Sequence, residues 1–514
     1  MGLNHWMALF TAPRASQPNP DCMRTLRLLP LLLLCLVVGT LAIDRRALWT
    51  DEIGTWSLTV AAGLSDWAER FLRHTNSDGQ LPLYHLVMYL WTQVFGSSEL
   101  ALRTANLPWF AIALVGLSRL RLAQPIVALT LGVFCLHALV WYQLNDARPY
   151  LLHLAGACWL LAGCVNLVIA AEDADSVDQS WRELLLGTFL LVGGSILGAF
   201  WILGASIALA LCYPRQLIRL LPSIARQPVL SALLLLATLL VLGVAVYSHL
   251  NGARASQAAS FSIAGMVYGV MELLGISGLG PSRHALRGQL AQADWLQMAL
   301  LLMAALLAAS ALVFCWWRLP PTRERLALAL ACLLPLLMLA ALGILLHWRV
   351  VGRHLSAALP LICLGMGLFL YQSVQHAGRW HRITAGLLVI ALLASTASIR
   401  WAPRHGKDDY RQAAIWAKEA LKRGERVLWI ADERALAYYG LGQPGEQALD
   451  TVPPGLIPFS RFQALQADAL SLPQTVILSP REGVDPGGLA RPVLATGRYK
   501  LEAQAIAFEL YRLR

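Results

Sequence analysis

Long apolar runs separated by short polar stretches repeat along the chain from about residue 28 to residue 399. A helix needs about 20 apolar residues to cross roughly 30 Å of hydrocarbon. The pattern therefore predicts an all-α polytopic membrane domain with about eleven spans and thirteen as the upper limit. The eleven predicted spans are 28–43, 100–118, 124–142, 148–171, 183–196, 199–213, 229–247, 294–316, 326–347, 355–371 and 383–400.

Three apolar stretches need a separate interpretation. Runs 183–196 and 199–213 are split at the glycines within 193–198, because a single run of about 30 residues exceeds one span. The segment LPLYHLVMYLWTQVF, residues 81–95, would cover only about 22 Å as a helix and is predicted to lie at the membrane surface. Residues 56–72 place apolar side chains at helical spacing opposite charged ones, which predicts a second surface helix.

Arginines in the short loops orient the spans, because Lys and Arg concentrate on the cytoplasmic side of a membrane. With a cytoplasmic N-terminus, one side receives Arg14, Arg24, Arg27, Arg119, Arg121, Arg215, Arg219, Arg226, Arg318, Arg323, Arg325, Arg379 and Arg382. The acidic loop EDADSVDQSW, residues 172–181, does not follow this pattern, but acidic residues carry little weight in the rule. The external loops are then 44–99, 143–147, 248–293 and 348–354, and the polar C-terminal stretch is also external.

The polar C-terminal stretch is predicted to be a small soluble α/β domain. Its pattern predicts helices over 409–423 and 433–439 and strands over 427–431, 475–479 and 507–513. It contains no glycine-rich phosphate loop, so we assign it acceptor binding or a structural cap over an active site. The predicted organisation is a cytoplasmic tail 1–27, a membrane domain 28–400 with an external catalytic loop 44–99, and a soluble domain 401–514.

Composition agrees with a membrane protein, since 57% of the 514 residues are hydrophobic and 14% are charged. The net charge of +11 comes mainly from arginines spread over the loops rather than gathered on one soluble face. This distribution argues against a nucleic-acid partner. The nine cysteines show no spacing typical of a metal site or a disulfide framework.

An acidic pair, Asp51 and Glu52, follows the first predicted span in LWTDEIGTWS. Charged groups next to a membrane span cost free energy unless they are paired with an opposite charge or serve a function. The pair is therefore either functional or a cap for a helix that begins at Ile53, because acidic residues stabilise a helix N-terminus. Glu52 could assist an acceptor, orient Asp51, or act only as the cap.

Two more polar elements lie on the same predicted face. NDARPY, residues 145–150, contributes Asp146, Arg148 and Tyr150 between two spans. HWRVVGRHL, residues 347–355, contributes external arginines, against the usual orientation rule. Arginine binds phosphate through two parallel hydrogen bonds, so phosphate binding is the simplest role for these loops.

The order of these motifs resembles the GT-C glycosyltransferases. The resemblance rests on the acidic pair, QLPLYHLVMYLW, FGSSELALRTANLPWF, NDARPY, GRHLSAALPL and DDYRQAAIWAKEAL, in this order along nearly the whole chain. It is nearest to the bacterial family 39-like branch, which includes protein O-mannosyltransferases and the lipid A aminoarabinose transferase. This resemblance implies a GT-C fold, a polyprenyl-phosphate-linked sugar donor, and a periplasmic active site in the bacterial inner membrane.

The resemblance also implies roles for individual residues. The catalytic candidates are Asp51, Glu52 and Asp146, and the candidates for binding the donor phosphate are Arg103, Arg148, Arg353 and His354. The candidates for binding substrate are Asp78, Tyr84, His85, Tyr150, Arg254 and Arg283. The chain has Leu-Pro-Leu-Tyr-His at 81–85 where the family commonly has Pro-Pro-Leu-Tyr-Tyr, and Arg353-His354 in place of Arg-Tyr. The acceptor, whether lipid, glycan or protein, stays open.

The chemistry predicted from these residues is transfer of a sugar with inversion. A carboxylate takes the acceptor proton while arginines receive the charge of the departing phosphate. Asp51 and Asp146 are hard ligands suited to Mg²⁺ or Mn²⁺, and the sequence leaves a divalent cation open. Two alternatives are a transporter or flippase of a lipid-linked precursor and a polysaccharide ligase or polymerase. Transporters place charges near the bilayer midplane and often contain inverted repeats, whereas here the charges gather at span ends.

Overall fold

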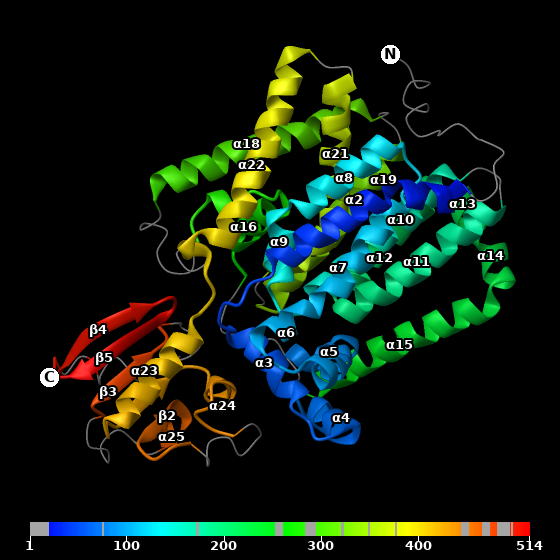
Figure 1. Ribbon diagram of the computed structural model, residues 1–514. Helices are drawn as coiled ribbons and strands as arrows, with labels where there is room; N and C mark the ends of the chain where they lie inside the picture. The colour runs from blue at the N-terminus through cyan, green and yellow to red at the C-terminus, as the bar shows by residue number, and fades with distance from the viewer. Residues whose placement is uncertain are drawn as a thin grey trace. The chain divides into compact units, whose positions relative to one another are not determined.

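The computed structural model in Figure 1 describes residues 20–74, 77–170, 174–251, 261–282, 294–319, 323–347, 350–375, 378–443, 452–464, 473–480, 494 and 497–514. Seven helices are long and apolar enough to cross a membrane: Glu99–Ser118, Tyr150–Ile169, Pro228–Leu250, Trp295–Arg318, Arg323–Leu345, Gly352–Gln375 and Arg379–Trp401. Two bent pairs, Gln124–Cys135 with Ala138–Leu144 and Gly198–Cys212 with Pro214–Arg226, raise the number to nine if each pair is one span. The chain is a mostly helical, multi-pass membrane protein.

These nine candidates fall on nine of the eleven predicted spans. The described apolar part of α2, Arg27–Ala42, is shorter than the others, and α11 begins with a polar stretch at Ala174. Within the described residues, the structure therefore contains seven to nine candidate spans rather than eleven to thirteen. The segment 81–95 forms α5 (Pro82–Phe95), a helix of 14 residues that is not a candidate span.

The chain divides into two compact units. The first, called the membrane unit below, comprises Met1–Ile43, His74–Leu86 and Arg103–His405. Its helices are α2 (Pro20–Ala42), η1 (Ser77–Gln80), α7 (Asn106–Ser118), α8 (Gln124–Cys135), α9 (Ala138–Leu144), α10 (Tyr150–Ile169), α11 (Ala174–Gly194), α12 (Gly198–Cys212), α13 (Pro214–Ile218), α14 (Leu220–Arg226), α15 (Pro228–Leu250), α16 (Ile263–Leu273), η2 (Ser277–Leu279), α18 (Trp295–Arg318), α19 (Arg323–Leu345), α20 (Gly352–Leu355), η4 (Ser356–Ala358), α21 (Leu359–Gln375), α22 (Arg379–Trp401) and η5 (Pro403–His405).

The second unit, called the loop–sheet unit below, comprises Asp44–Arg73, Val87–Leu102 and Gly406–Arg514. It contains α3 (Thr50–Thr59), α4 (Leu64–Arg73), α23 (Tyr410–Lys422), β1 (Val427–Ile430), α24 (Arg434–Tyr438), β2 (Leu456–Pro458), α25 (Phe459–Ala464), β3 (Thr475–Leu478), β4 (Tyr499–Ala505) and β5 (Phe508–Leu513). Helices α5 and α6 (Glu99–Thr104) contribute residues to both units. Most of the predicted external loop, without residues 74–86, thus folds with the polar C-terminal stretch in one compact unit.

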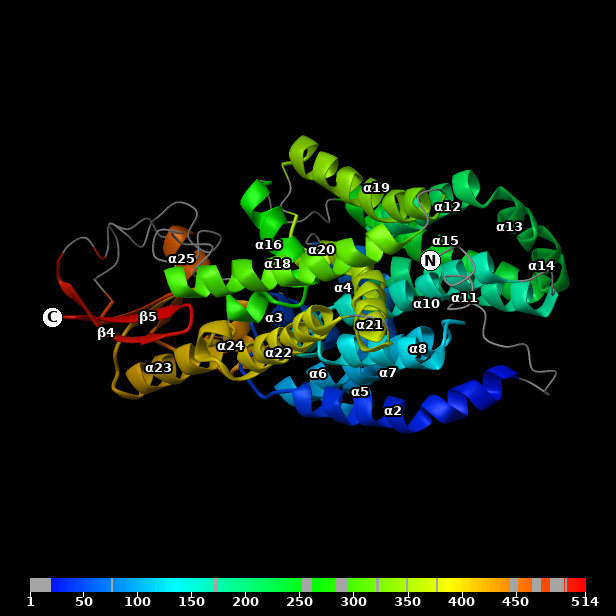
Figure 2. The same ribbon diagram turned by 90° about the horizontal axis from the view of Figure 1, so that it is seen from above.

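Close helix packing shapes the membrane unit where α10 meets α11. The two helices lie side by side (Figures 1 and 2), and glycines on each helix face the backbone of the other. A side chain at Gly156 would collide with the backbone of Leu191, and one at Gly187 would collide with the backbone of Leu160. Within lipid, the hydrophobic effect does not drive helices together, and small residues allow the close packing that holds them.

The polar start of α11 is explained by partners at its end of the bundle. Glu183 is 1% exposed and accepts a hydrogen bond of 2.7 Å from Asn166 on α10, while Arg119 lies 3.3 Å from the same carboxylate. Asp178, in the stretch predicted as an acidic loop, pairs with Arg226 and is helical. The loop prediction for 172–181 was wrong from residue 174 onward, because ion pairs and amide hydrogen bonds allow the helix to begin early.

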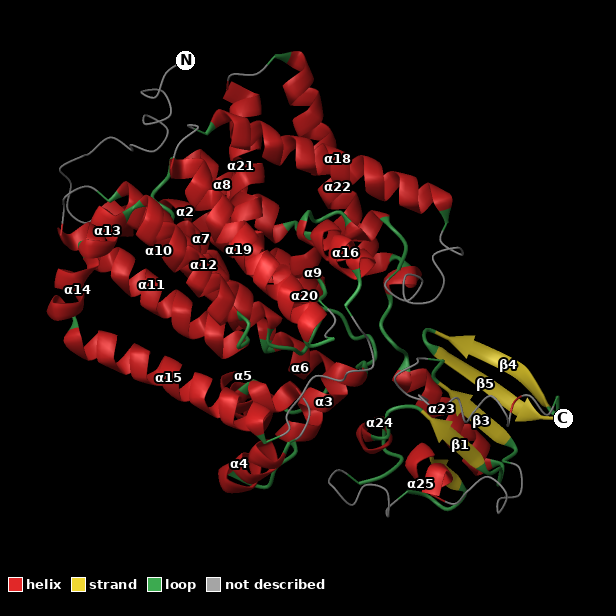
Figure 3. Cartoon of the chain, turned by 180° about the vertical axis from the view of Figure 1, so that it is seen from behind, coloured by secondary structure: helices red, strands yellow, loops and turns green. Residues whose placement is uncertain are grey.

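The loop–sheet unit is built around a mixed sheet with the strand order β2-β1-β3-β5-β4. Strands β2, β1 and β3 run parallel, whereas β5 pairs antiparallel with both β3 and β4. Helix α23 packs against the sheet (Figure 3), and Tyr410 on this helix stacks edge-on against Phe508 at 4.7 Å between ring centroids. All predicted helices and strands of this stretch are present; β2, β4 and α25 were not predicted.

Two predicted helices differ from the observed ones. The surface helix predicted over 56–72 is two helices, α3 and α4, separated at residues 60–63, and α3 begins at Thr50 rather than at Ile53. The single span predicted over 124–142 is bent by 57° between α8 and α9, where His137 accepts a hydrogen bond of 3.2 Å from the Leu139 amide. The predicted split at 193–198 is confirmed, since α11 ends at Gly194 and α12 begins at Gly198.

We predict that Gly156→Ala lowers the thermal unfolding midpoint of the protein purified in detergent by several degrees. The added methyl group meets backbone atoms that cannot move aside, and overpacking of this kind costs about 1–3 kcal/mol. The matched control is Gly243→Ala on α15, where an added Cβ has no neighbour within 4 Å and the midpoint should not fall. Equal midpoints for the two variants would contradict the close packing of α10 on α11.

Candidate active site

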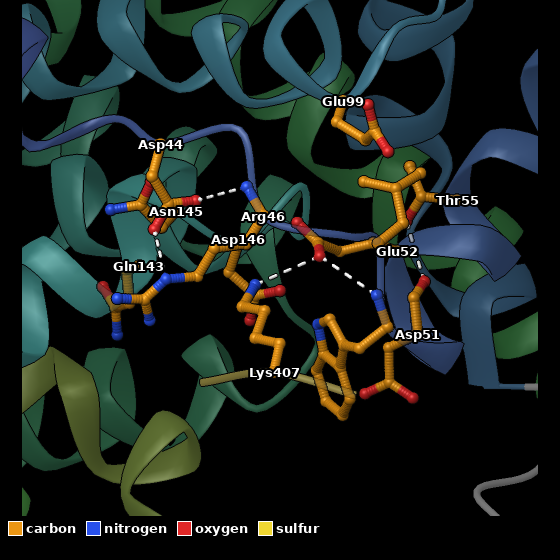
Figure 4. Close-up of polar contacts among 12 residues, drawn as sticks. Asp44, Arg46, Asp51, Glu52, Thr55, Glu99, Gln143, Asn145, Asp146 and Lys407 are labelled. Atoms are coloured by element: carbon orange, nitrogen blue, oxygen red, sulfur yellow. Dashed lines mark hydrogen bonds and ion pairs between the residues drawn. The ribbon is translucent and has the colours of Figure 1, made fainter. Parts of the chain in front are cut away.

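The acidic pair lies in the first turn of α3, within the loop–sheet unit. Neighbouring residues in an α-helix are separated by about 100° around the axis, so their side chains leave the helix in different directions. Asp51 is partly exposed, whereas Glu52 is fully buried. Figure 4 shows the two carboxylates pointing away from each other. The pair therefore presents one accessible carboxylate, that of Asp51.

The buried carboxylate of Glu52 has two partners in the same unit (Figure 4). It accepts a hydrogen bond of 3.3 Å from the amide of Trp49, the residue before α3, and its Oε2 atom lies 3.2 Å from Lys407 Nζ. The cap interpretation of Glu52 is thus confirmed, because it satisfies a backbone donor at the helix N-terminus. Lys407 adds a charge partner that the sequence pattern did not reveal.

In the membrane unit, the turn that follows α9 is held by Asn106 at the start of α7. The Asn106 amide nitrogen lies within hydrogen-bond distance of the carbonyl oxygens of Gln143, Leu144 and Asp146, at 3.1, 3.2 and 2.7 Å. Asn145 similarly donates to the Ala42 carbonyl oxygen at the end of α2, at 2.7 Å. These contacts fix the backbone of the NDARPY motif, so Asp146 and Arg148 leave it in defined positions.

Arg148 brings two separate sequence motifs together. Its guanidinium lies 2.6 Å from the carboxylate of Asp78 in η1, and both side chains are less than 10% exposed. His85 on α5 is fully buried, with its Nε2 atom 3.9 Å from the same Asp78 oxygen. Tyr84 is also fully buried and packs edge-on against His85 at 5.4 Å between ring centroids. The LPLYH and NDARPY motifs thus form one buried cluster.

Burial and charge set the protonation of this cluster, whose members Asp78 and His85 lie outside the candidate spans. Burial alone raises the pKa of Asp78, but the charges of Arg148 and the nearby histidines, together with the Arg148 hydrogen bond, lower it to about 2. Burial lowers the pKa of His85 to about 3; Asp78 opposes this shift and Arg148 adds to it. At neutral pH the cluster therefore holds an ionised Asp78–Arg148 pair beside a neutral imidazole.

The HWRVVGRHL motif, residues 347–355, contacts the NDARPY turn through Tyr150. The Arg353 guanidinium lies over the Tyr150 ring, 5.4 Å from its centroid, and both side chains are partly exposed. His354 accepts a hydrogen bond of 3.2 Å from the Val351 amide and so caps the short helix α20. A cation on an aromatic face keeps its outward donors directed away from the ring.

The predicted arginines differ in burial. Arg103 on α6 is fully buried, Arg148 is 5% exposed, and Arg353 is partly exposed. Arg254 and Arg283 lie outside the described residues. Among the described residues there is no group of three or more His, Cys, Asp or Glu side chains that could hold a metal ion, and the divalent cation stays an open alternative.

Sequence reasoning did not identify three residues of these clusters. Asn106 is a single amide in an apolar helix, and its role is visible only when the turn after α9 is placed beside it. Lys407 is one of four lysines in the sequence, all of them in the C-terminal stretch, but no local pattern links it to Glu52. Gln143 is 1% exposed and its side-chain amide has no hydrogen-bond partner in the described part of the chain. Such an amide can donate to one hydroxyl and accept from another.

Two solved structures of ArnT from Cupriavidus metallidurans are similar to this chain. The apo structure has a TM-score of 0.50 and 11% sequence identity, and the match covers 95% of this chain and 98% of ArnT. The structure bound to undecaprenyl phosphate has a TM-score of 0.48 and 13% identity, with coverage of 99% and 98%. No family model and no curated protein matches the chain. At this identity the likeness to the apo structure establishes the fold: the chain has an ArnT-like fold.

We predict that His85 makes the protein less stable as the pH falls below about 6.5. Its pKa is lower in the folded protein than in the unfolded chain, so the unfolded chain binds the proton first on acidification. The stabilisation is complete above pH about 6.5 and is lost toward pH about 3, with a slope of up to about 1.4 kcal/mol per pH unit. Asp78, with its pKa of about 2, contributes a loss only at lower pH.

The measurement compares unfolding midpoints of wild type and His85→Asn from pH 6.5 to pH 4.5. His85→Asn should have a flatter dependence on pH because the titrating group is gone. The same slope for both proteins would mean that His85 does not stay neutral in the folded state.

Proposed function

We propose that this chain is an inverting glycosyltransferase that moves a monosaccharide from a polyprenyl-phosphate carrier to an acceptor at the periplasmic face of a bacterial inner membrane. The observation that carries the proposal is the ArnT-like fold over 95% of the chain. ArnT has also been solved bound to undecaprenyl phosphate. A fold alone does not determine chemistry, so the role of each residue depends on its burial and contacts in this chain.

Asp51 is proposed as the base. The acceptor hydroxyl has to reach a carboxylate, and Asp51 is partly exposed on the first turn of a helix. Glu52 is buried against Lys407 and the Trp49 amide, so its carboxylate is already committed. The structure thus supports Asp51 alone as the catalytic member of the pair, with Glu52 as its anchor.

Arg353 is proposed as the main cation for the donor phosphate. A phosphate oxygen needs donors that it can reach, and Arg353 is partly exposed, whereas Arg103 and Arg148 are buried. Arg148 is also paired with Asp78 at 2.6 Å. We therefore assign Arg148 and Asp78 to holding the NDARPY turn, with Asp146 and Tyr150 positioned by it, rather than to direct contact with phosphate.

The reaction then needs one base and one cation. The acceptor oxygen attacks the anomeric carbon, the bond from that carbon to the phosphate oxygen breaks, and Asp51 receives the hydroxyl proton. The polyprenyl phosphate departs with both electrons of the broken bond, and Arg353 stabilises the charge that it gains. Attack opposite the leaving group inverts the anomeric centre, because no covalent sugar–enzyme intermediate intervenes.

The first test of this proposal is Asp51→Asn. Transfer of labelled sugar from a polyprenyl-phosphate donor by the purified protein should fall by about 100-fold or more, since a positioned base contributes roughly 10²–10⁴-fold. Asp66→Asn is the matched control, because Asp66 is a partly exposed carboxylate in the first turn of α4 in the same predicted loop, paired with its neighbour Arg70, and it should retain activity. Full transfer by Asp51→Asn would remove Asp51 from the mechanism. Movement of lipid-linked sugar across vesicles without any transfer would instead identify a transporter.

The second test replaces Arg353. Arg353→Gln should lower kcat/KM for the donor by about 10²–10³-fold, the usual effect of removing one donor to a developing oxyanion. The kcat/KM of Arg353→Lys should lie between those of wild type and Arg353→Gln, because an ammonium keeps the charge but loses the paired hydrogen bonds. Arg379→Gln, at the exposed start of α22, is the control and should behave as wild type. Unchanged donor kinetics in Arg353→Gln would contradict the assignment.

A further inference from the structure

Four side chains from the C-terminal part of the loop–sheet unit contact the segment that leads into α3. Tyr439 accepts a hydrogen bond of 3.0 Å from the Leu48 amide, and the Tyr410 hydroxyl lies 2.9 Å from the hydroxyl of Thr50. Arg411 donates to the Arg45 carbonyl oxygen at 2.6 Å. The fourth contact is the Lys407–Glu52 ion pair at 3.2 Å. Residues 45–52 are therefore held at four points by residues 407–439.

The Lys407–Glu52 pair differs from the other three contacts in its burial and charge. The two side chains are 8% and 0% exposed, and the Lys407 ammonium also lies over the Trp49 ring, 5.7 Å from its centroid. A buried carboxylate that loses its cation is left with an uncompensated charge, which is strongly unfavourable. Glu52 must then rearrange, take up a proton or admit water, and a rearrangement of its side chain displaces the first turn of α3.

The first turn of α3 also carries Asp51. Because Asp51 and Glu52 are adjacent on one helix, a rotation that releases Glu52 turns Asp51 by the same angle. Small displacements of a catalytic group lower the rate strongly, since the reacting atoms must be aligned before the chemical step.

We infer that Lys407 is a positioning residue: through Glu52 it fixes the direction of the Asp51 carboxylate. The consequence for catalysis rests on the proposed function, whereas the anchoring of α3 does not. The soluble C-terminal stretch thus orients the acid-bearing helix, a role distinct from acceptor binding. Lys407 acts through Glu52 and needs no contact with substrate.

The experiment uses the full-length protein with Lys407→Met, Lys407→Arg and the exposed Lys418→Met on α23 as the matched control. Lys407→Met should lower kcat for sugar transfer by about tenfold or more with little change in the donor KM, because alignment rather than binding is lost. Lys407→Arg keeps the charge and should retain most of the rate. Hydrogen exchange of the amides of residues 50–56 should accelerate about tenfold in Lys407→Met and stay unchanged in Lys418→Met.

The double variant Lys407→Met/Glu52→Gln keeps the test valid if Lys407→Met folds poorly. Removing both charges leaves no buried ion, so the double variant should fold at least as well as Lys407→Met, while its kcat stays low because the anchor is absent.

Wild-type kcat together with wild-type exchange in Lys407→Met would overturn the inference. A lower kcat without faster exchange would overturn it as well, because Lys407 would then act on the reaction by another route. Faster exchange in a protein whose wild type transfers no sugar would refute the proposed function and leave the anchoring intact.

Discussion

Pairing of a buried carboxylate with a cation joins segments that are distant in the sequence in both units of the protein. In the membrane unit, Asp78 is paired with Arg148, which joins η1 to the turn after α9. In the loop–sheet unit, Glu52 is paired with Lys407, which joins the start of α3 to the segment before α23. Removing one member of such a pair costs about 3–5 kcal/mol, whereas an intact pair contributes little net stability. The pairs therefore determine which segments lie together rather than how stable the protein is.

The membrane fold could be predicted from sequence to the extent that hydropathy records lipid contact. Runs such as Pro228–Leu250 are mostly exposed in the structure and apolar all round, so the pattern alone located them. Hydropathy does not locate the start or the bend of a helix where the helix contacts protein instead of lipid. The first half of α11 is polar because Asn166, Arg119 and Arg226 solvate its acids. Helices α8 and α9 are too apolar to reveal the bend at His137.

The candidate site, like the fold, could be predicted from sequence only in part. The order of motifs led to Asp51, Arg148 and Arg353 because these residues stand out against apolar surroundings. Sequence could not rank them, since burial decides which charges are accessible and burial depends on partners far away in the chain. In the sequence, Lys407 is separated from Glu52 by most of the membrane unit, so no periodicity or spacing connects the two residues. Asn106 likewise acts on carbonyl oxygens, which carry no signature in the residue types around them.

The loop–sheet unit is discontinuous in the chain, and this affects how the protein is made. Residues 44–73 emerge from the ribosome early, but their partners at 406–439 follow all the membrane helices, and β5 between β3 and β4 follows later still. Domains fold as their segments become available during synthesis, and closing a long loop is slow. Until then α3 lacks the residues that hold its first turn. In a nascent chain, the first turn of α3 is therefore held in place only after residues 406–439 have been synthesised and have folded against it.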